Sequence, residues 1–458
     1  MKSFGMTVPK IVLIGVCGVI LMYISVAGIV SVATPWWTRG DTKEHLDYTW
    51  RLWHGHIPTW SDGIQTPAIK KLTGFKIETA SVNPPLFYLI HAPVVGPMLD
   101  QGKLNQAIAV GRSINVFMGV LAAVALSWAG WVFGGKRRGL FAIAIPALSV
   151  LIFRFTRLNV DYALDALLVT LTTLSLVLDY KILRDGLSRR NGIAIALVSV
   201  AGMATKAPYI VFLLGSLLTI FLAEWQRIKR SYLTRFLRSC LWPAILFILV
   251  AAAIGWFYYL RDYRLSHNWF SSLPPKYGRA HMSLKQVLSN KKLWQMWYYN
   301  FSSYARISVL LSAIGLSGWL TVNNRKIKTY FADQANLWIV VILALTLGGV
   351  FLTQIRFAMG GGSVNFRYML PAILSISLVL GYGLLSVRQL RGQLVSLVAI
   401  LMGGTTLLQI GHPAKIVKLA TVNGVPSLLT YLILILFPVG VLLLGWSLWS
   451  LSGSRSAN

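Results

Sequence analysis

The sequence has 458 residues, of which 56% are hydrophobic and only 12% are charged, and its mean hydropathy is +0.64. This composition excludes a chain that folds in water and is typical of a polytopic membrane protein. The formal charge of +30 is divided between short connections and two long loops, with no soluble basic segment that could hold a duplex, so we expect no nucleic-acid partner.

Apolar runs of helical length predict an all-α protein with about 12 transmembrane helices. In chain order the runs cover 11–33, 108–133, 139–153, 160–180, 192–205, 207–223, 241–260, 305–322, 335–355, 368–387, 394–411 and 428–451. The first run is longer than the apolar part of a signal peptide and lacks a clear cleavage site, so we interpret it as a retained span. Without repeats or soluble segments, 1–458 is expected to form one transmembrane domain.

Positive charge in the short connections predicts the topology. Lys and Arg are concentrated in the even-numbered connections at 134–139, 180–192, 224–239, 323–331 and 387–393. Because short basic loops stay in the cytoplasm, both termini are expected there, with the odd-numbered connections outside. Two of the outside loops, 34–107 and 261–304, are long and carry cations that suit the phosphates of a lipid bilayer.

The first outside loop gathers carboxylates in a chain that has only 13 acidic residues. Asp41, Glu44, His45 and Tyr48 have the i, i+3, i+4, i+7 spacing of one helix face, whereas Asp47 lies off that face, and its substitution is expected to be mild. A carboxylate at this boundary can remove the proton of a hydroxyl acceptor as a general base. A solvated interfacial helix that ends the first span explains the same spacing.

Further along, Pro84 and Pro85 fix the chain where it returns to the membrane, and the apolar residues after them predict an interfacial helix. In the run at 160–180, Asp161 and Asp165 lie one turn apart near the start of a span. Intramembrane carboxylates are costly and should face a cavity or a cation, for which Lys206 is a candidate. Structural pairing and substrate contact both remain open.

Together these segments resemble the GT-C glycosyltransferases, in the bacterial branch with protein O-mannosyltransferase-like and aminoarabinose transferase-like proteins. The matching segments, in the order of the family's motifs, are "WWTRGDTKEHLDYTWRLWHGHIP", "NPPLFY" (83–88), "ATKAP" (204–208) and "RYMLP" (367–371). Asp41 stands at the position of the catalytic Asp. Thr42 replaces a Glu found in many relatives, and Asn83 stands where many carry His or another polar ligand.

The resemblance implies a GT-C fold and transfer of a sugar from a polyprenyl-phosphate donor to a hydroxyl acceptor, which is a lipid, glycan or protein. The reaction would occur on the outer face of a bacterial plasma membrane, with inversion at the anomeric carbon. Asp41 would be the general base, and Glu44 would substitute for the acid missing at Thr42. Lys206 and Arg367 would hold the donor phosphate.

The remaining expectations concern the substrate and the second loop. The residues expected to contact substrate are His45, Tyr48, Asn83, Asp161 and Tyr368. The loop 261–304, which is rich in cations and aromatic residues, is expected to form an interfacial helix over the donor cavity. No cofactor is required, and a divalent metal is left open without assigned ligands.

Other classes of membrane protein fit parts of this pattern. A transporter or a lipid or glycan flippase is the main alternative, and it predicts ionisable residues near the bilayer midplane and a repeat between the halves. This chain instead gathers carboxylates in one external loop. A polymerase or ligase of lipid-linked glycans would have its large loop later in the chain, and a non-catalytic scaffold explains neither the carboxylates nor the motif order.

Overall fold

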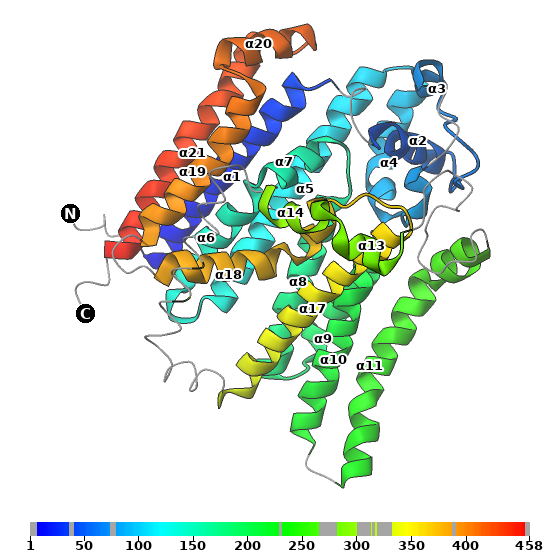
Figure 1. Cartoon of the computed structure of the whole chain (residues 1–458), viewed down its shortest axis with the longest axis vertical. Coiled ribbons are helices and arrows are strands. Elements are labelled where there is room, and N and C mark those ends of the chain that lie inside the picture. The colour runs from blue at the N-terminus through cyan, green and yellow to red at the C-terminus, as the bar shows by residue number, and fades with distance from the viewer. Residues whose placement is uncertain are drawn as a thin grey trace.

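A computed structural model describes residues 7–35, 41–73, 79–228, 231–264, 282–299, 332–386 and 391–453, with the single positions 313 and 317. Every regular element within these residues is a helix, and no strand occurs among them (Figure 1). The prediction of an all-α protein is therefore confirmed. The predicted span at 305–322, residues 36–40 of the first loop and much of the loop 261–304 lie outside the described residues.

The helices follow one another with short connections. In chain order they are α1 (Val8–Ala33), α2 (Thr42–Trp53), α3 (Pro67–Thr73), η2 (Thr79–Val82), α4 (Leu86–Asp100), α5 (Leu104–Phe133), η3 (Gly135–Arg137), α6 (Arg138–Val150), α7 (Phe153–Val160), α8 (Asp165–Asp185), α9 (Arg189–Met203), η4 (Ala207–Tyr209), α10 (Ile210–Arg227), α11 (Tyr232–Gly255), η5 (Trp256–Tyr263), α13 (Leu284–Ser289), α14 (Lys291–Tyr299), α17 (Gln334–Met359), η7 (Phe366–Ala372), α18 (Ile373–Ser386), α19 (Arg391–Ile410), α20 (Pro413–Val422) and α21 (Ser427–Gly453).

Nine helices of the described part are long and apolar enough to cross a membrane, or ten if the bent pair α6–α7 forms one span. They indicate a multi-pass membrane protein, as predicted. The run at 139–153 is a broken element, because α6 and α7 meet at 63°. The run at 192–205 corresponds to α9, whose 15 residues are fewer than the ~20 of a usual span. The count of about 12 and the GT-C fold stay predictions.

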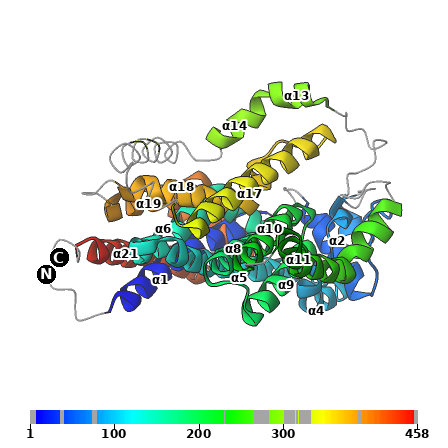
Figure 2. The same ribbon diagram turned by 90° about the horizontal axis from the view of Figure 1, so that it is seen from below.

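The first and last of these helices pack tightly along their length. α1 begins and α21 ends at the same end of the molecule (Figures 1 and 2). At their crossing a Cβ on Gly18 would lie 2.7 Å from the carbonyl oxygen of Gly440, so only glycine permits the backbones to come this close. Close approach through small residues is how membrane helices gain van der Waals contact where lipid removes the hydrophobic drive between them.

The first outside loop is largely helical. α2, α3, η2 and α4 lie between the end of α1 and the start of α5, which confirms the predicted helices, and α4 extends the apolar segment after Pro85 to Asp100. α2 begins after Asp41 and ends before Gly55, whose φ of 74° belongs to the left-handed region that glycine adopts easily. This compact group of helices stands at the end of the molecule where α1 ends (Figure 1).

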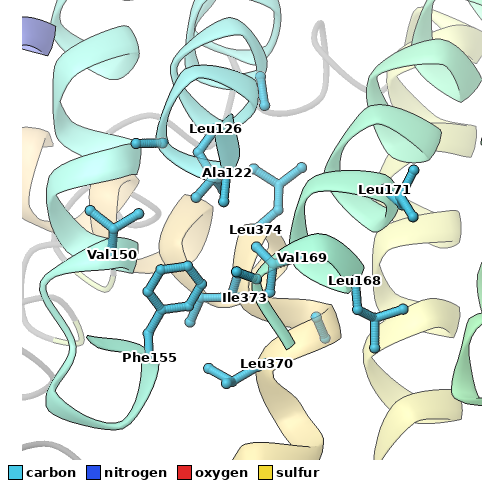
Figure 3. Packing of buried hydrophobic residues seen from close by; sticks show 14 of the residues in the cluster. Ala122, Leu126, Val150, Phe155, Leu168, Val169, Leu171, Leu370, Ile373 and Leu374 are labelled. Carbon is cyan, nitrogen blue, oxygen red and sulfur yellow. The ribbon is translucent and has the colours of Figure 1, made fainter. Parts of the chain in front are cut away.

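A hydrophobic cluster fixes where α8 and η7 begin. It joins Ala122 and Leu126 of α5, Val150 of α6, Phe155 of α7, Leu168, Val169 and Leu171 of α8, Leu370 of η7, and Ile373 and Leu374 of α18 (Figure 3). Every one of these side chains is buried. Their packing holds the first turn of α8 beside η7, although the two segments are separated by about 200 positions in the sequence.

Candidate functional site

Four charged side chains from four parts of the chain meet at the start of α8. Asp165 accepts a hydrogen bond from Lys206 Nζ at 3.0 Å and another from Arg367 Nε at 2.8 Å. Arg367 Nη1 lies 3.3 Å from a carboxylate oxygen of Asp41. Two cations thus face two anions, and the cluster, here named the ion cluster (Asp41, Asp165, Lys206 and Arg367), has no net formal charge.

Asp165 is the buried centre of this ion cluster. Its side chain is 1% exposed, against 12% for Lys206 and 16% for Arg367. It stands in the first turn of α8, where the helix dipole favours a carboxylate. A buried carboxylate requires such partners, since an unpaired charge away from water is very costly.

The turn before α8 is strained and tightly enclosed. Tyr162 has a φ of 55°, which is uncommon for an aromatic residue, and its side chain is fully buried. Its hydroxyl lies 3.1 Å from Thr49 Oγ1, and a Cβ on Gly111 would lie 2.1 Å from its ring. Glycine at 111 is therefore needed for the ring, and contacts from α2 and α5 maintain the turn that aims Asp165 at the cations.

Lys206 and Arg367 are presented by short helical turns. Lys206 has extended backbone directly before η4, and the neighbouring Ala204 carbonyl accepts the Leu86 N–H at 3.0 Å. The "ATKAP" and "NPPLFY" segments are thereby joined. Asn365 caps η7 by accepting the Arg367 N–H at 3.1 Å, and Lys206 Nζ lies 5.7 Å from the centre of the Tyr368 ring. Tyr368 therefore borders the ion cluster, as its expected substrate contact requires.

Asp41 is the accessible member of the ion cluster. Its side chain is 51% exposed, and although it occupies the N-cap position of α2, it makes no capping hydrogen bond there. Thr42, the residue that replaces an acid in the resemblance, donates its hydroxyl to the Asp161 carbonyl oxygen at 2.8 Å. Thr42 thus ties the start of α2 to the turn before α8, which keeps Asp41 near Arg367.

Glu44 lies one turn on from Asp41 but is buried. Its side chain is almost inaccessible, and Oε2 has no hydrogen-bond partner. Burial raises the pKa of Glu44 to about 7, and the charges of Asp41 and Asp47 act in the same direction. At neutral pH Glu44 is therefore close to half protonated, unlike an ordinary surface glutamate.

The other predicted substrate contacts of the first loop are used within the loop. His45 Nδ1 lies 2.8 Å from the Tyr88 hydroxyl, and the rings of Tyr48 and Tyr88 stack at 3.8 Å between centroids. The Tyr48 hydroxyl donates to the Asn83 carbonyl oxygen at 3.2 Å. His45 and Tyr48 are both buried, so these residues hold α2 against α4 and position Asp41 from behind.

Asp47 has a role that the spacing does not reveal. Its Oδ1 accepts the N–H groups of Gln65 and Thr66 at 2.8 and 2.6 Å, and its Oδ2 accepts Arg51 Nε at 2.7 Å. Asp47 is completely buried. The expectation that its substitution is mild must be corrected, because a buried and fully paired carboxylate is costly to replace.

Other predicted features have a different placement. The structure brings Asp165, rather than Asp161, into contact with Lys206; Asp161 caps the end of α7. In the loop 261–304, α13 and α14 are described, and Trp294 of α14 packs on Phe351 of α17 at 6.2 Å. Figure 2 shows both helices on the α17 side of the molecule. Among the described residues, no group of His, Cys, Asp and Glu side chains could hold a metal ion.

Comparison with known proteins adds no relative to this geometry. No protein-family model matches the sequence, and no curated protein matches it. What the site can do must therefore be argued from its own chemistry. An exposed carboxylate stands beside two cations that are anchored on a buried carboxylate, an arrangement suited to receiving a proton and binding an anion at the same place.

Proposed function

We propose that the protein is a GT-C-type glycosyltransferase that moves a sugar from a polyprenyl-phosphate donor to a hydroxyl acceptor on the outer face of the membrane. The observation that carries this proposal is the ion cluster itself. Three of its members, Asp41, Lys206 and Arg367, belong to three of the segments that resemble the family's motifs, and the fourth segment is joined to them by the hydrogen bond from Leu86 to Ala204.

The cations are suited to a donor phosphate because their positions are fixed in advance. Asp165 holds Lys206 and Arg367 Nε, and in the described part of the chain Arg367 Nη2 makes no hydrogen bond. A phosphate oxygen can take up that N–H and the remaining protons of the Lys206 ammonium. Preorganised donors of this kind stabilise the negative charge that develops on a departing phosphate without a cost of reorganisation in the transition state.

The exposed carboxylate is suited to the acceptor. The acceptor oxygen forms a bond to the anomeric carbon while the bond from that carbon to the phosphate oxygen breaks. The hydroxyl proton moves to Asp41, and the electron pair leaves with the polyprenyl phosphate, which Lys206 and Arg367 stabilise. Attack from the face opposite the leaving group inverts the anomeric carbon. The donor enters from the bilayer and the acceptor from water, and α2 lies between the two.

The test uses cells in which the gene is deleted and replaced by variants. Asp41→Asn keeps the shape of the side chain but removes its basicity, and general-base catalysis contributes roughly 10²–10⁴-fold. We expect the polyprenyl-phosphate sugar to accumulate in the deletion strain and in the Asp41→Asn strain, as measured by mass spectrometry of extracted lipids. With the accumulated lipid as donor, purified Asp41→Asn protein should transfer sugar at least about 100-fold more slowly than the unmodified protein.

Two further variants sharpen this test. Arg367→Lys keeps a charge but cannot reach both Asp165 and Asp41, so we expect a loss of at least about tenfold in donor turnover. Asp185→Asn is the control, because this carboxylate is exposed at the opposite end of α8. Transfer at the unmodified rate by Asp41→Asn protein, or no accumulation of any lipid-linked sugar in the deletion strain, would disprove the proposal.

A transporter or flippase is the second candidate, and one observation favours it: Asp179 is a carboxylate buried within the apolar span α8. Reconstituted vesicles separate the two functions. Movement of a labelled lipid-linked sugar between leaflets, without transfer to any acceptor, would support the second candidate.

A further inference from the structure

A second group of polar side chains lies inside the bundle, between α8, α9 and α10. Its members are Ser175 and Asp179 of α8, Ser199 of α9, Tyr209 of η4, and Ser216 and Thr219 of α10. Each of these residues is at most 1% exposed. This group is here named the hydroxyl cluster. Asp179 lies 14 positions after Asp165 on the same helix, which is roughly 20 Å along the axis.

Most oxygens of the hydroxyl cluster lack hydrogen bonds. Ser175 and Ser216 bond to each other at 3.0 Å. Both carboxylate oxygens of Asp179, the hydroxyls of Ser199 and Thr219, and the Tyr209 hydroxyl are buried without a hydrogen-bond partner. Ser216 and Thr219 are the hydroxyl residues beside the Asp179 carboxylate, whereas Ser175 and Ser199 are beside the Tyr209 hydroxyl.

Unpaired buried oxygens of this kind carry a free-energy cost. A hydroxyl away from water without a hydrogen bond costs roughly 1–3 kcal/mol, and an isolated carboxylate costs more. In the described residues no Lys, Arg or His is bonded to Asp179. The carboxylate must therefore take up either a proton or a cation that comes from outside the chain.

The geometry favours a cation over a proton. A protonated Asp179 would be a hydrogen-bond donor beside two hydroxyl acceptors, yet neither of its oxygens makes a hydrogen bond. Oxygens that surround a cation all direct lone pairs at it and need not bond to one another. One carboxylate is balanced by one positive charge, while a divalent ion would leave an uncompensated charge in the low-dielectric interior.

We propose that the hydroxyl cluster is a binding site for a monovalent cation, with Na⁺ as the ion to be tested. Asp179 supplies the negative charge, and the hydroxyls of Ser216 and Thr219 supply neutral ligands. Occupation of the site links α8 to α10. The proposal does not depend on the proposed glycosyl transfer, because the hydroxyl cluster shares no residue with the ion cluster.

The test measures the thermal stability of the purified full-length protein in lipid nanodiscs. NaCl replaces choline chloride at constant ionic strength and constant pH, and unfolding is followed by tryptophan fluorescence. A ligand that binds only the folded state stabilises it in proportion to the logarithm of its concentration above Kd. We expect the Tm to rise by at least about 2 °C with Na⁺. Radioactive Na⁺ should also be retained by the protein.

The variants assign the effect to the hydroxyl cluster. Asp179→Asn should abolish both the Na⁺-dependent shift in Tm and the retention of radioactive Na⁺, whereas Asp185→Asn, an exposed carboxylate on the same helix, should keep both. Thr219→Val retains the charge and should raise the half-saturating Na⁺ concentration by about tenfold, as expected for the loss of one ligand. This variant decides the question if Asp179→Asn fails to fold.

Several outcomes would overturn the proposal. Identical Tm values in Na⁺ and choline over the whole concentration range would show that no cation binds. A Tm that depends on pH but not on Na⁺ would identify Asp179 as a protonated acid. A Na⁺ response that persists in both Asp179→Asn and Thr219→Val proteins would place the ion elsewhere.

Discussion

Glu44 shows how burial changes the chemistry of a single residue. The folded protein keeps its proton up to a pKa of about 7, while the unfolded chain releases the proton near 4.5. The folded state therefore binds more protons between these values, and the contribution of Glu44 to stability falls as the pH rises from 4.5 through 7. The full difference corresponds to roughly 3 kcal/mol.

Glu44→Gln should remove this dependence. We expect the variant and the unmodified protein to have similar Tm values at pH 5, with the variant increasingly more stable at pH 6, 7 and 8. The comparison is made between the two proteins at each pH, because the lowered pKa of His45, caused chiefly by burial, gives a dependence of opposite sign in both. A Tm difference that does not change with pH would contradict the assignment.

The sequence predicted residue types better than residue roles. The resemblance placed Asp41, Lys206, Arg367 and Tyr368 at the site, and the structure brings them together. Spacing alone could not separate Asp161 from Asp165, since two carboxylates one turn apart share a face only if the helix is continuous. The left-handed turn at Tyr162 breaks it, and no glycine or proline at that position signals the break.

At the scale of elements, α2 is fixed by contacts that its own amphipathic pattern does not reveal. Asp47 lies off the predicted face, yet it binds the backbone of Gln65 and Thr66 and the side chain of Arg51. Arg51 in turn donates to Asp62 at 3.0 Å and to the carbonyl oxygen of Gly63. These bonds connect α2 to the segment before α3 across nearly twenty positions.

Asp47→Asn should therefore destabilise the first loop. The amide cannot accept all of these hydrogen bonds, and it leaves the buried Arg51 without its closest anion, at a cost of about 3–5 kcal/mol. We expect faster proteolysis within 34–107 and a lower Tm. Asp62→Asn alters a partly exposed partner of the same Arg51 and should have a smaller effect. Equal protease resistance of the Asp47→Asn and unmodified proteins would refute this role.

Element boundaries were predictable where apolarity alone decides them. Long spans such as α1, α5 and α21 coincide with predicted runs, because lipid requires an uninterrupted apolar helix. The bend between α6 and α7 was not foreseen, since the sequence at 151–152 is Leu-Ile and remains apolar through the break. Packing against neighbouring helices, which the local sequence does not encode, determines such a bend.

At the scale of the whole molecule, the basic connections predict which ends face the cytoplasm. Ser61, in the first long loop, and Ser188, before α9, lie in connections predicted to be on opposite sides of the membrane. In a background with Cys17 and Cys240 replaced by alanine, a cysteine at Ser61 should react with an impermeant maleimide in intact cells. A cysteine at Ser188 should react only after the membrane is permeabilised. The reverse pattern would invert the topology and remove the ion cluster from the outer face.

The contact between Gly18 and Gly440 has a consequence for biosynthesis. Chains are made from the amino-terminal end, so α1 enters the membrane long before α21 exists, and its closest neighbour is the last of the described helices to leave the ribosome. Until then the glycine face of α1 meets lipid or a temporary partner. Every charged contact at the end of α1 is therefore completed late, and the protein can become active only after almost the whole chain has been translated.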